Sequence, residues 1–311
     1  MKNTRIFSKK FDIPIDDVFG KYVSYSQFSM WSECPHRWRL TYIDKIKEPD
    51  FSIHSLFGDV VHNIIQNWLI KLYTVSVKES NSVDFEYELR TQMFELYTKI
   101  KDEQNNSKNW LEKEQLIEFY SDGLSILDFL KKHRLEYFDR RCEELIGIEL
   151  PLKIQLSGNG PIFTAYLDGV FLDLRTRRII IRDLKTSTRG WNDWDKRNET
   201  KISQLLLYKV FFSQQYNVPI DNIDVEYYIF RRKTDVTGDF PPKRLQTFRP
   251  AQKTPSYSKA IRNFNLFIAD GFDNGEYKMK EYLPMSSKKS CTFCPFIDND
   301  VACPKNKRIC I

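Results

Sequence analysis

The sequence lacks several features that would assign it to a whole class of proteins. No stretch approaches the run of about 20 apolar residues that crosses a bilayer. The N-terminus has no apolar segment typical of a secretory signal, and Asp12, Asp16 and Asp17 come too early for a transit peptide. No G-x-x-x-x-G-K-[ST] phosphate loop and no internal repeat is present. We therefore expect a soluble cytoplasmic protein that binds no membrane and borrows any DNA unwinding from another protein.

The composition indicates a globular chain. The 311 residues include 48 Lys and Arg against 42 Asp and Glu, a net charge of +6 that permits a polyanionic partner without requiring one. Hydrophobic residues make up 41% and aromatic residues 14%, which excludes collagen-like, low-complexity and wholly disordered chains. A chain of this length corresponds to about two average domains, or to one large domain with insertions.

The periodicity of apolar residues divides the chain into four parts. Residues 1–20 form a lead-in, and residues 21–144 have mostly helical spacing. Residues 145–280 contain short runs rich in β-branched residues, and residues 281–311 are rich in cysteine. This order predicts an α/β core with a helical N-terminal insertion. The expected elements are helices over 25–42, 56–69, 201–216 and 258–272, an antiparallel meander of strands over 145–156, 162–174 and 178–184, a strand over 225–232 and a basic loop over 240–256.

Two carboxylates and a lysine interrupt the expected strands. Asp183 and Lys185 are two residues apart, so both project from the same face of a strand, and Asp168 interrupts the apolar run before it. Carboxylate oxygens suit Mg²⁺, which activates water and offsets the charge that develops on a phosphate. A nearby ammonium group can orient that water or help to deprotonate it. Taken alone, Asp-x-Lys fits a surface ion pair better than a metal site.

Three further polar residues lie on apolar helices. His62 follows Gly58 by about one turn within the helix over 56–69. A single histidine on such a face is most often a hydrogen-bonded core residue, although imidazole is also a frequent metal ligand. Gln204 and Tyr208 are four residues apart and therefore share one face of the helix over 201–216.

The order Gly-x-x-x-His, Asp, Asp-x-Lys and Gln-x-x-x-Tyr resembles the RecB-like branch of the PD-(D/E)XK nuclease superfamily. That branch includes the nuclease domains of RecB and AddB and the CRISPR-associated adaptation nucleases. The Ser-x-Ser and Cys-Pro-His-Arg-Trp motifs within 24–42 are similar to the opening segment of the same branch. The resemblance covers residues 22–70, 145–232 and 285–305, and leaves 85–142 without a matching motif. It implies a restriction-endonuclease-like core, in which helices flank a mixed central sheet.

The resemblance also implies a metal site for Mg²⁺ or Mn²⁺. Asp168, Asp183 and the backbone carbonyl of Leu184 would bind the metal, and His62 would be an additional ligand. Glu149 either joins the metal shell, as in some relatives, or is a structural or surface carboxylate.

The remaining matched residues would act around that metal. Lys185 would position the attacking water, while Gln204 and Tyr208 would hold the site and the DNA strand in register. The implied activity is metal-dependent hydrolysis of DNA.

Four of the six cysteines lie in the last 21 residues, where a reducing compartment favours a metal or a cluster over disulfides. Together with one upstream cysteine they can supply four thiolates to a 4Fe–4S cluster or to a structural zinc, or the cysteines can remain unligated. The iron–sulfur members of the resembled branch use one N-terminal and three C-terminal cysteines. Cys310 can replace Cys303 as the last ligand, and Cys142 is expected to be a buried apolar thiol. The expected ligands are Cys34, Cys291, Cys294 and Cys303.

A basic segment with two tryptophans over 186–201 follows the Asp-x-Lys motif. Its rings can stack on unpaired bases, or they can pack at the base of a solvated loop. The expected DNA contacts are Arg37, Arg189, Trp191, Trp194 and Lys201.

The function expected from these residues is that of an exonuclease on single-stranded DNA ends or flaps in recombination, repair, replication or phage and defence processes. It would work in a bacterial or phage-infected cell, together with a helicase or recombination partner. One alternative is a catalytically silent or endonucleolytic subunit that binds DNA ends within a helicase–nuclease complex. Another is a redox- or iron-sensing protein, which only the cysteines support. The sequence does not fix the oligomeric state or the polarity of cleavage.

Overall fold

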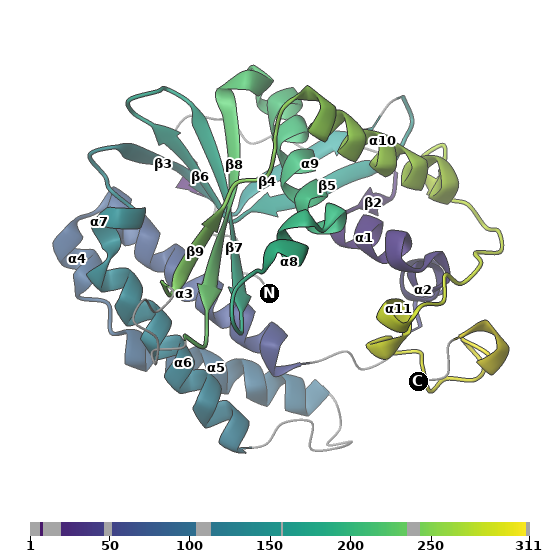
Figure 1. The fold of residues 1–311 in the computed structure, drawn as a ribbon, viewed down its shortest axis with the longest axis horizontal. Helices are drawn as coiled ribbons and strands as arrows, with labels where there is room; N and C mark the ends of the chain where they lie inside the picture. The colour runs from purple at the N-terminus through teal and green to yellow at the C-terminus, as the bar shows by residue number, and fades with distance from the viewer. Residues whose placement is uncertain are drawn as a thin grey trace. The chain divides into compact units, whose positions relative to one another are not determined.

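The computed structural model describes residues 7–8, 20–46, 52–103, 113–156, 158–234 and 243–308. These residues form two compact units, each built from separate stretches of the chain (Figure 1). The first unit takes its described residues from 7–8, 52–103, 113–151, 166–234 and 243–253. The second takes them from 20–46, 152–156, 158–165 and 254–308.

The first unit is built on a mixed six-stranded sheet of order β1-β3-β6-β7-β8-β9. β7 and β8 pair in parallel, and the other neighbouring strands pair antiparallel. The strands are β1 (Phe7–Ser8), β3 (Glu143–Ile148), β6 (Gly169–Asp173), β7 (Ile179–Ser187), β8 (Ile223–Arg231) and β9 (Leu245–Phe248).

Helices cover both faces of this sheet, as the resembled fold requires. α3, α5 and α6 share an apolar core with Leu184, Tyr228 and Phe230, whereas α9 packs on β7 and β8 from the face that carries Tyr227. The helices are α3 (Ile53–Thr74), α4 (Val77–Asn81), α5 (Phe85–Glu103), α6 (Lys113–Lys132), α7 (Arg134–Tyr137), α8 (Asp193–Arg197), α9 (Glu199–Tyr216) and the 3₁₀ turn η2 (Ile220–Asn222).

Two of the expected strands are each broken in two, but the expected antiparallel meander is confirmed in the pairing of β3 with β6 and of β6 with β7. The strand over 145–156 breaks at Glu149, whose φ of 51° is left-handed, and the strand over 162–174 breaks at Asp168. In each case one half pairs in the six-stranded sheet and the other half pairs in a three-stranded sheet. The expected loop over 240–256 contains strand β9, which pairs with β8.

The second unit combines the sheet β2-β5-β4 with an aromatic core. Trp38 is fully buried and contacts Phe267, Phe272 and Tyr282. The helix expected over 25–42 is interrupted at Cys34, whose extended backbone (φ −160°) ends one helix and begins the next. The elements are β2 (Tyr22–Val23), α1 (Tyr25–Glu33), α2 (Pro35–Trp38), the π-helical turn η1 (Arg39–Ile43), β4 (Leu150–Gln155), β5 (Ile162–Leu167), α10 (Thr254–Gly271), β10 (Phe272–Asp273), β11 (Glu276–Tyr277), α11 (Lys288–Thr292) and η3 (Lys305–Lys307).

None of the helices in the described part of the chain is both long and apolar enough to cross a membrane. The division of the sequence into four ranges remains a prediction.

Candidate active site

Asp183 and Lys185 lie side by side on β7. Strand alternation directs both side chains to the same face, and Lys185 Nζ lies 2.5 Å from Asp183 Oδ2. Asp183 is 4% exposed, whereas the Lys185 side chain is 33% exposed. Apart from this ion-pair contact, Asp183 Oδ2 has no hydrogen-bond partner among the described residues. A metal ion at this buried oxygen would share it with, or displace, the ammonium group of Lys185.

Asp168 joins this pair from the break between β5 and β6. Its Oδ2 accepts a hydrogen bond of 2.7 Å from the backbone N–H of Leu184, the residue between Asp183 and Lys185. In an extended strand the N–H and C=O of one residue point to the same side. The carbonyl of Leu184 therefore leaves the strand on the side of Asp168, as the predicted metal site requires.

The charges of the three groups are coupled. Burial raises the pKa of Asp183 to about 6, with a further increase from the charge of Asp168 and an opposing decrease from Lys185. Burial disfavours the charged form of Lys185, but Asp183 and Asp168 outweigh this effect and raise the pKa of its ammonium group. At neutral pH Lys185 is therefore a cation that can donate hydrogen bonds.

His62 on α3 contributes an unpaired nitrogen. Its Nε2 is buried and has no hydrogen-bond partner within the described ranges. Burial, together with the positive charge of Lys185, lowers the pKa of His62 to about 4, although Asp183, Asp59 and Glu149 oppose this shift. His62 is therefore a neutral imidazole, the form that binds metals, among several carboxylates.

Glu149 is connected to the site by a residue on α3, the helix that carries His62. The side chain of Gln66, one turn after His62, donates to Glu149 Oε1 at 2.6 Å and to the backbone oxygen of Asp168 at 3.4 Å. The side-chain amide of Gln66 therefore bonds both residues at which the strands break, and Gln66 is 4% exposed. Sequence reasoning did not identify Gln66, since only the folded arrangement connects it to Glu149.

Gln204 and Tyr208 are connected on α9, as their spacing predicts. Gln204 Nε2 donates to the Tyr208 hydroxyl at 3.0 Å. Tyr227 on β8 links them to the strand that bears Asp183: its hydroxyl lies 3.2 Å from Gln204 Oε1 and 2.5 Å from the backbone oxygen of Lys201. Lys185 Nζ lies 5.8 Å from the centre of the Tyr227 ring. The sequence analysis missed Tyr227 because its apolar context resembles that of any buried strand residue.

The opposite face of β7 carries two buried ion pairs that share Arg182. Arg182 is 5% exposed and forms ion pairs of 2.7 Å with both Glu143 and Glu226. Its guanidinium also contacts the rings of Phe171 and Tyr228, at 4.5 and 4.8 Å. These contacts hold β7 between β6 and β8, directly behind the carboxylate of Asp183.

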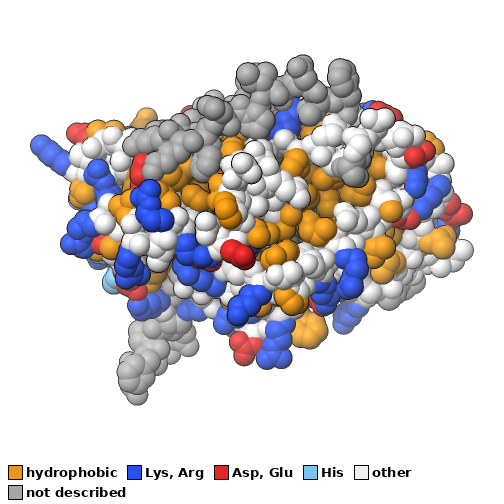
Figure 2. Space-filling view, turned by 90° about the horizontal axis from the view of Figure 1, so that it is seen from above, with side chains coloured by type: hydrophobic (Ala, Val, Ile, Leu, Met, Phe, Trp, Pro, Cys, Tyr) orange, Lys and Arg blue, Asp and Glu red, His pale blue; other side chains and the backbone are white. Residues whose placement is uncertain are grey.

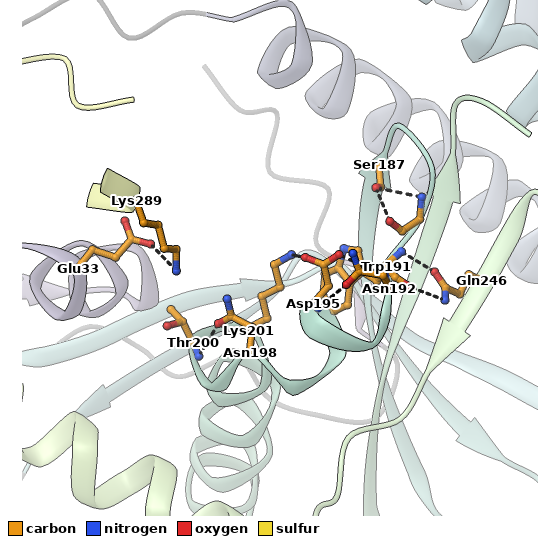
Figure 3. Close-up of polar contacts among 11 residues, drawn as sticks. Glu33, Ser187, Trp191, Asn192, Asp195, Asn198, Thr200, Lys201, Gln246 and Lys289 are labelled. Carbon is orange, nitrogen blue, oxygen red and sulfur yellow. Dashed lines mark hydrogen bonds and ion pairs between the residues drawn. The ribbon is translucent and has the colours of Figure 1, made fainter. Parts of the chain in front are cut away.

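The two tryptophans after β7 have different surroundings. Trp191 packs on Tyr227 at 4.6 Å between ring centres, and its backbone N–H and C=O both bond the side chain of Gln246 (Figure 3). Lys201 lies over the Trp191 ring at 4.6 Å and pairs with Asp195 at 2.7 Å. Trp191 thus packs at the base of the loop, which was one of the two alternatives drawn from the sequence.

Trp194 is available to a ligand, since it is 80% exposed. Arg189 is also exposed, on the turn between Ser187 and Gly190. Gly190 has a φ of 86°, and a Cβ there would lie 2.4 Å from Arg231 Nε, so this turn requires glycine. Arg37 belongs to the second unit and is half-buried. On the face seen in Figure 2, Lys and Arg side chains lie among acidic and hydrophobic ones, so charge alone marks no DNA path there.

In the second unit, the four predicted cysteines line one small cavity. Cys34 lies between α1 and α2, and Cys291 is buried in α11. Burial raises the pKa values of Cys294 and Cys303, and the other cysteines of the group raise them further. These two thiols are therefore protonated at neutral pH, and a metal that binds them must displace protons. Cys142 is exposed, which corrects the expectation of a buried thiol, and Cys310 lies outside the described residues.

A histidine holds the C-terminal segment beside these cysteines. The ring nitrogens of His36 lie 3.2 Å from the carbonyl oxygen of Tyr282 and 2.9 Å from that of Ala302. Ala302 immediately precedes Cys303, so His36 helps to fix the position of that thiol.

In the part of the chain that the structure describes, no three or more His, Cys, Asp or Glu side chains are arranged so that they could hold a metal as they stand. The donor chemistry nevertheless fits a divalent ion at Asp183 and His62, where a buried carboxylate oxygen is paired with Lys185 and a buried imidazole nitrogen has no hydrogen-bond partner among the described residues. No iron–sulfur or zinc site is formed among the described residues.

The model of the family described as the PD-(D/E)XK nuclease superfamily matches residues 22–299. No curated protein matches the chain significantly.

Proposed function

The chain belongs to the PD-(D/E)XK nuclease superfamily, which implies metal-dependent hydrolysis of phosphodiester bonds, and from this premise we propose a deoxyribonuclease of the RecB-like branch. The observation that carries the proposal is the contact between Asp183 and Lys185, joined to Asp168 through the backbone N–H of Leu184. It brings two carboxylates and an ammonium group together on one strand.

Each residue of the site has a chemical role in this proposal. Asp168, Asp183 and the Leu184 carbonyl are the ligands of Mg²⁺ or Mn²⁺, and His62 offers its unpaired Nε2 to the same ion. When bound, the ion supplies Lewis acidity that activates water and offsets charge on the phosphate.

Lys185 acts as a hydrogen-bond donor, because its raised pKa keeps it protonated at neutral pH. It orients the attacking water and offsets negative charge at the scissile phosphate. Gln204 and Tyr208 fix the face of α9 that lies beside Tyr227, and so keep Lys185 in its place.

We further propose that single-stranded ends or flaps are the substrate. The exposed ring of Trp194, next to the basic residues Lys196 and Arg197, suits unpaired bases and a phosphate backbone. A helicase or recombination partner would supply the strand. This setting is a cytoplasm in which DNA is repaired, recombined or degraded.

The second unit carries the proposed cluster. The four cysteines that line one cavity suit a 4Fe–4S cluster, or a structural zinc, that fixes Cys34 to the C-terminal segment. In this role the metal stabilises the fold and takes no part in hydrolysis.

The test is cleavage of 5′- and 3′-labelled single- and double-stranded DNA by anaerobically purified protein with Mg²⁺ or Mn²⁺. Asp183→Ala and Lys185→Ala should each lower the rate by about 100-fold or more. The first variant lacks a proposed metal ligand, and the second lacks the cation that offsets negative charge at the scissile phosphate. Asp224→Ala is the control, since it breaks the 2.6 Å ion pair with Arg178 near the other ends of the same strands. Label position gives the polarity. A wild-type protein that binds DNA but cleaves none of these substrates would favour the silent end-binding subunit.

A further inference from the structure

A surface pocket of about 560 Å³ lies on the second unit, beside the cysteines but separate from their cavity. It is formed where the end of α1 and the start of α2 approach α11. No residue of the active site contributes to it. Its lining includes Glu33, Arg37, Lys288, Lys289, Thr292 and Phe293.

The pocket carries an excess of positive charge. Arg37, Lys288 and Lys289 line the pocket, and Glu33 is the one carboxylate among its lining residues. Lys289 Nζ is 3.9 Å from Glu33 Oε1 (Figure 3), and the Lys289 side chain is 69% exposed, so this pair is loose. Lys288 is exposed and forms no ion pair with any other described residue. Lys288 and Lys289 are therefore available to an anion from solution.

An aromatic ring stands at the same pocket. Phe293 is 85% exposed, although phenylalanine is normally buried. Its position is constrained, because it lies between Cys291 and Cys294 directly after α11, and the backbone N–H of Cys294 bonds the carbonyl of Cys291. An exposed ring on a fixed backbone offers a flat surface at low entropic cost.

We infer that this pocket binds single-stranded DNA, with a backbone phosphate at Lys288, Lys289 and Arg37 and an unpaired base stacked on Phe293. Cations beside an aromatic ring are the combination that recognises unpaired strands. A duplex offers the same phosphates but keeps its bases stacked internally, so it would use the lysines and not the ring. The inference deepens the proposed nuclease function and rests on it for the identity of the strand.

The experiment measures binding without cleavage. The full-length Asp183→Asn variant, with Ca²⁺ in place of Mg²⁺, is titrated into fluorescein-labelled oligo(dT) and into a blunt duplex of equal length, at several salt concentrations. Adding Lys288→Ala and Lys289→Ala should make the plot of log binding constant against log salt concentration for the single strand less steep by about 1.4. This is the change expected for the loss of two phosphate contacts. Adding Phe293→Ala should weaken single-strand binding about fivefold or more, and duplex binding much less.

Controls with the same chemical change lie elsewhere on the chain. Lys71 and Lys78 are exposed on α3 and α4, so Lys71→Ala with Lys78→Ala removes the same charge. Phe94 on α5 is 68% exposed, so Phe94→Ala removes an equally solvated ring. Circular dichroism checks folding, and Lys288→Gln, Lys289→Gln and Phe293→Leu replace any alanine variant that unfolds.

The outcomes separate this inference from the proposed function. Pocket variants that bind like their controls, an equal loss on duplex and single strand, or a protein that binds neither DNA would overturn the inference. Absence of cleavage by the wild type, with binding that depends on Lys288, Lys289 and Phe293, would overturn the nuclease and leave the pocket standing.

Discussion

The carboxylate of Asp168 accepts a hydrogen bond of 2.7 Å from the backbone N–H of Leu184. This bond connects a residue at a strand break to the middle of β7, and it brings Asp168 close enough to raise the pKa of Asp183. The proposed metal ligands are thus organised by the backbone before any metal binds, which lowers the cost of assembling the site.

Because the pKa of Asp183 is raised, we predict that Asp183→Asn stabilises the metal-free protein relative to wild type increasingly as pH rises. Because its pKa in the fold is about 6 against an ordinary 3.8, the carboxyl stabilises the fold below about pH 4, and this contribution is lost as pH rises through 6. The asparagine variant has no such loss. Its free energy of unfolding relative to wild type should therefore rise between pH 4 and pH 7, by up to about 3 kcal/mol.

Urea titrations across this pH range measure the effect. The variant also loses the contact with Lys185, which lowers its free energy of unfolding. The test is therefore the change with pH in the difference between variant and wild type, and not the size of that difference at one pH. Asp173→Asn is the control of opposite sign, because backbone N–H groups of Thr176 and Arg175 lower the pKa of Asp173. A flat Asp183→Asn profile would contradict the shift.

His62→Gln should weaken Mn²⁺ binding about tenfold or more, because it removes a buried neutral nitrogen from a residue whose pKa responds to the charges of Asp183 and Glu149. Isothermal titration calorimetry measures the affinity directly, without DNA. His54→Gln is the control, since His54 lies on the same helix but packs against Phe119. Equal affinities for the two variants would remove His62 from the site.

Tyr227→Phe should lower the cleavage rate about five- to tenfold, with a loss of about 1 kcal/mol in the free energy of unfolding. The variant keeps the ring beside Lys185 but loses the hydroxyl that bonds Lys201 and Gln204. Tyr216→Phe removes a hydroxyl that bonds a backbone carbonyl, that of Pro151, at the far end of α9. A positioning role requires slower turnover in Tyr227→Phe alone, at comparable stability.

Cys291→Ser should abolish the absorbance near 400 nm and the bound iron of anaerobically purified protein, or the bound zinc if the site holds zinc. Cys142→Ser should change neither, because Cys142 is exposed and does not line the cysteine cavity. Comparison of Cys303→Ser with Cys310→Ser identifies the last ligand. Metal that is retained in all four variants would show that these cysteines bind none.

Strand and helix periodicity predicted the local part of the candidate site. Alternation placed Asp183 and Lys185 on one face of β7, and the spacing of four brought Gln204 and Tyr208 together on α9. Both relationships span few residues, so they depend only on the geometry of one element.

The longer-range part could not be predicted. A left-handed backbone usually shows in the sequence as glycine or asparagine, but here the residue is Glu149, with a φ of 51°. The energetic cost of this conformation is offset by contacts that form only in the fold, such as the hydrogen bond from Gln66. Tyr227 could not be predicted either, because its role depends on the parallel pairing that sets it opposite Asp183.

The buried Arg182, which directly precedes the Asp-Leu-Lys segment, also helps to set the pairing register of β7 during folding. If β7 paired one residue out of register, every side chain would change faces, and Asp183 would lie among the rings that now surround Arg182. Glu143 and Glu226 would then confront a carboxylate instead of a guanidinium, with like charges buried together. A misregistered strand is thus rejected electrostatically by the face that carries Arg182, and this rejection favours the register in which Asp183 lies beside Lys185 on the other face.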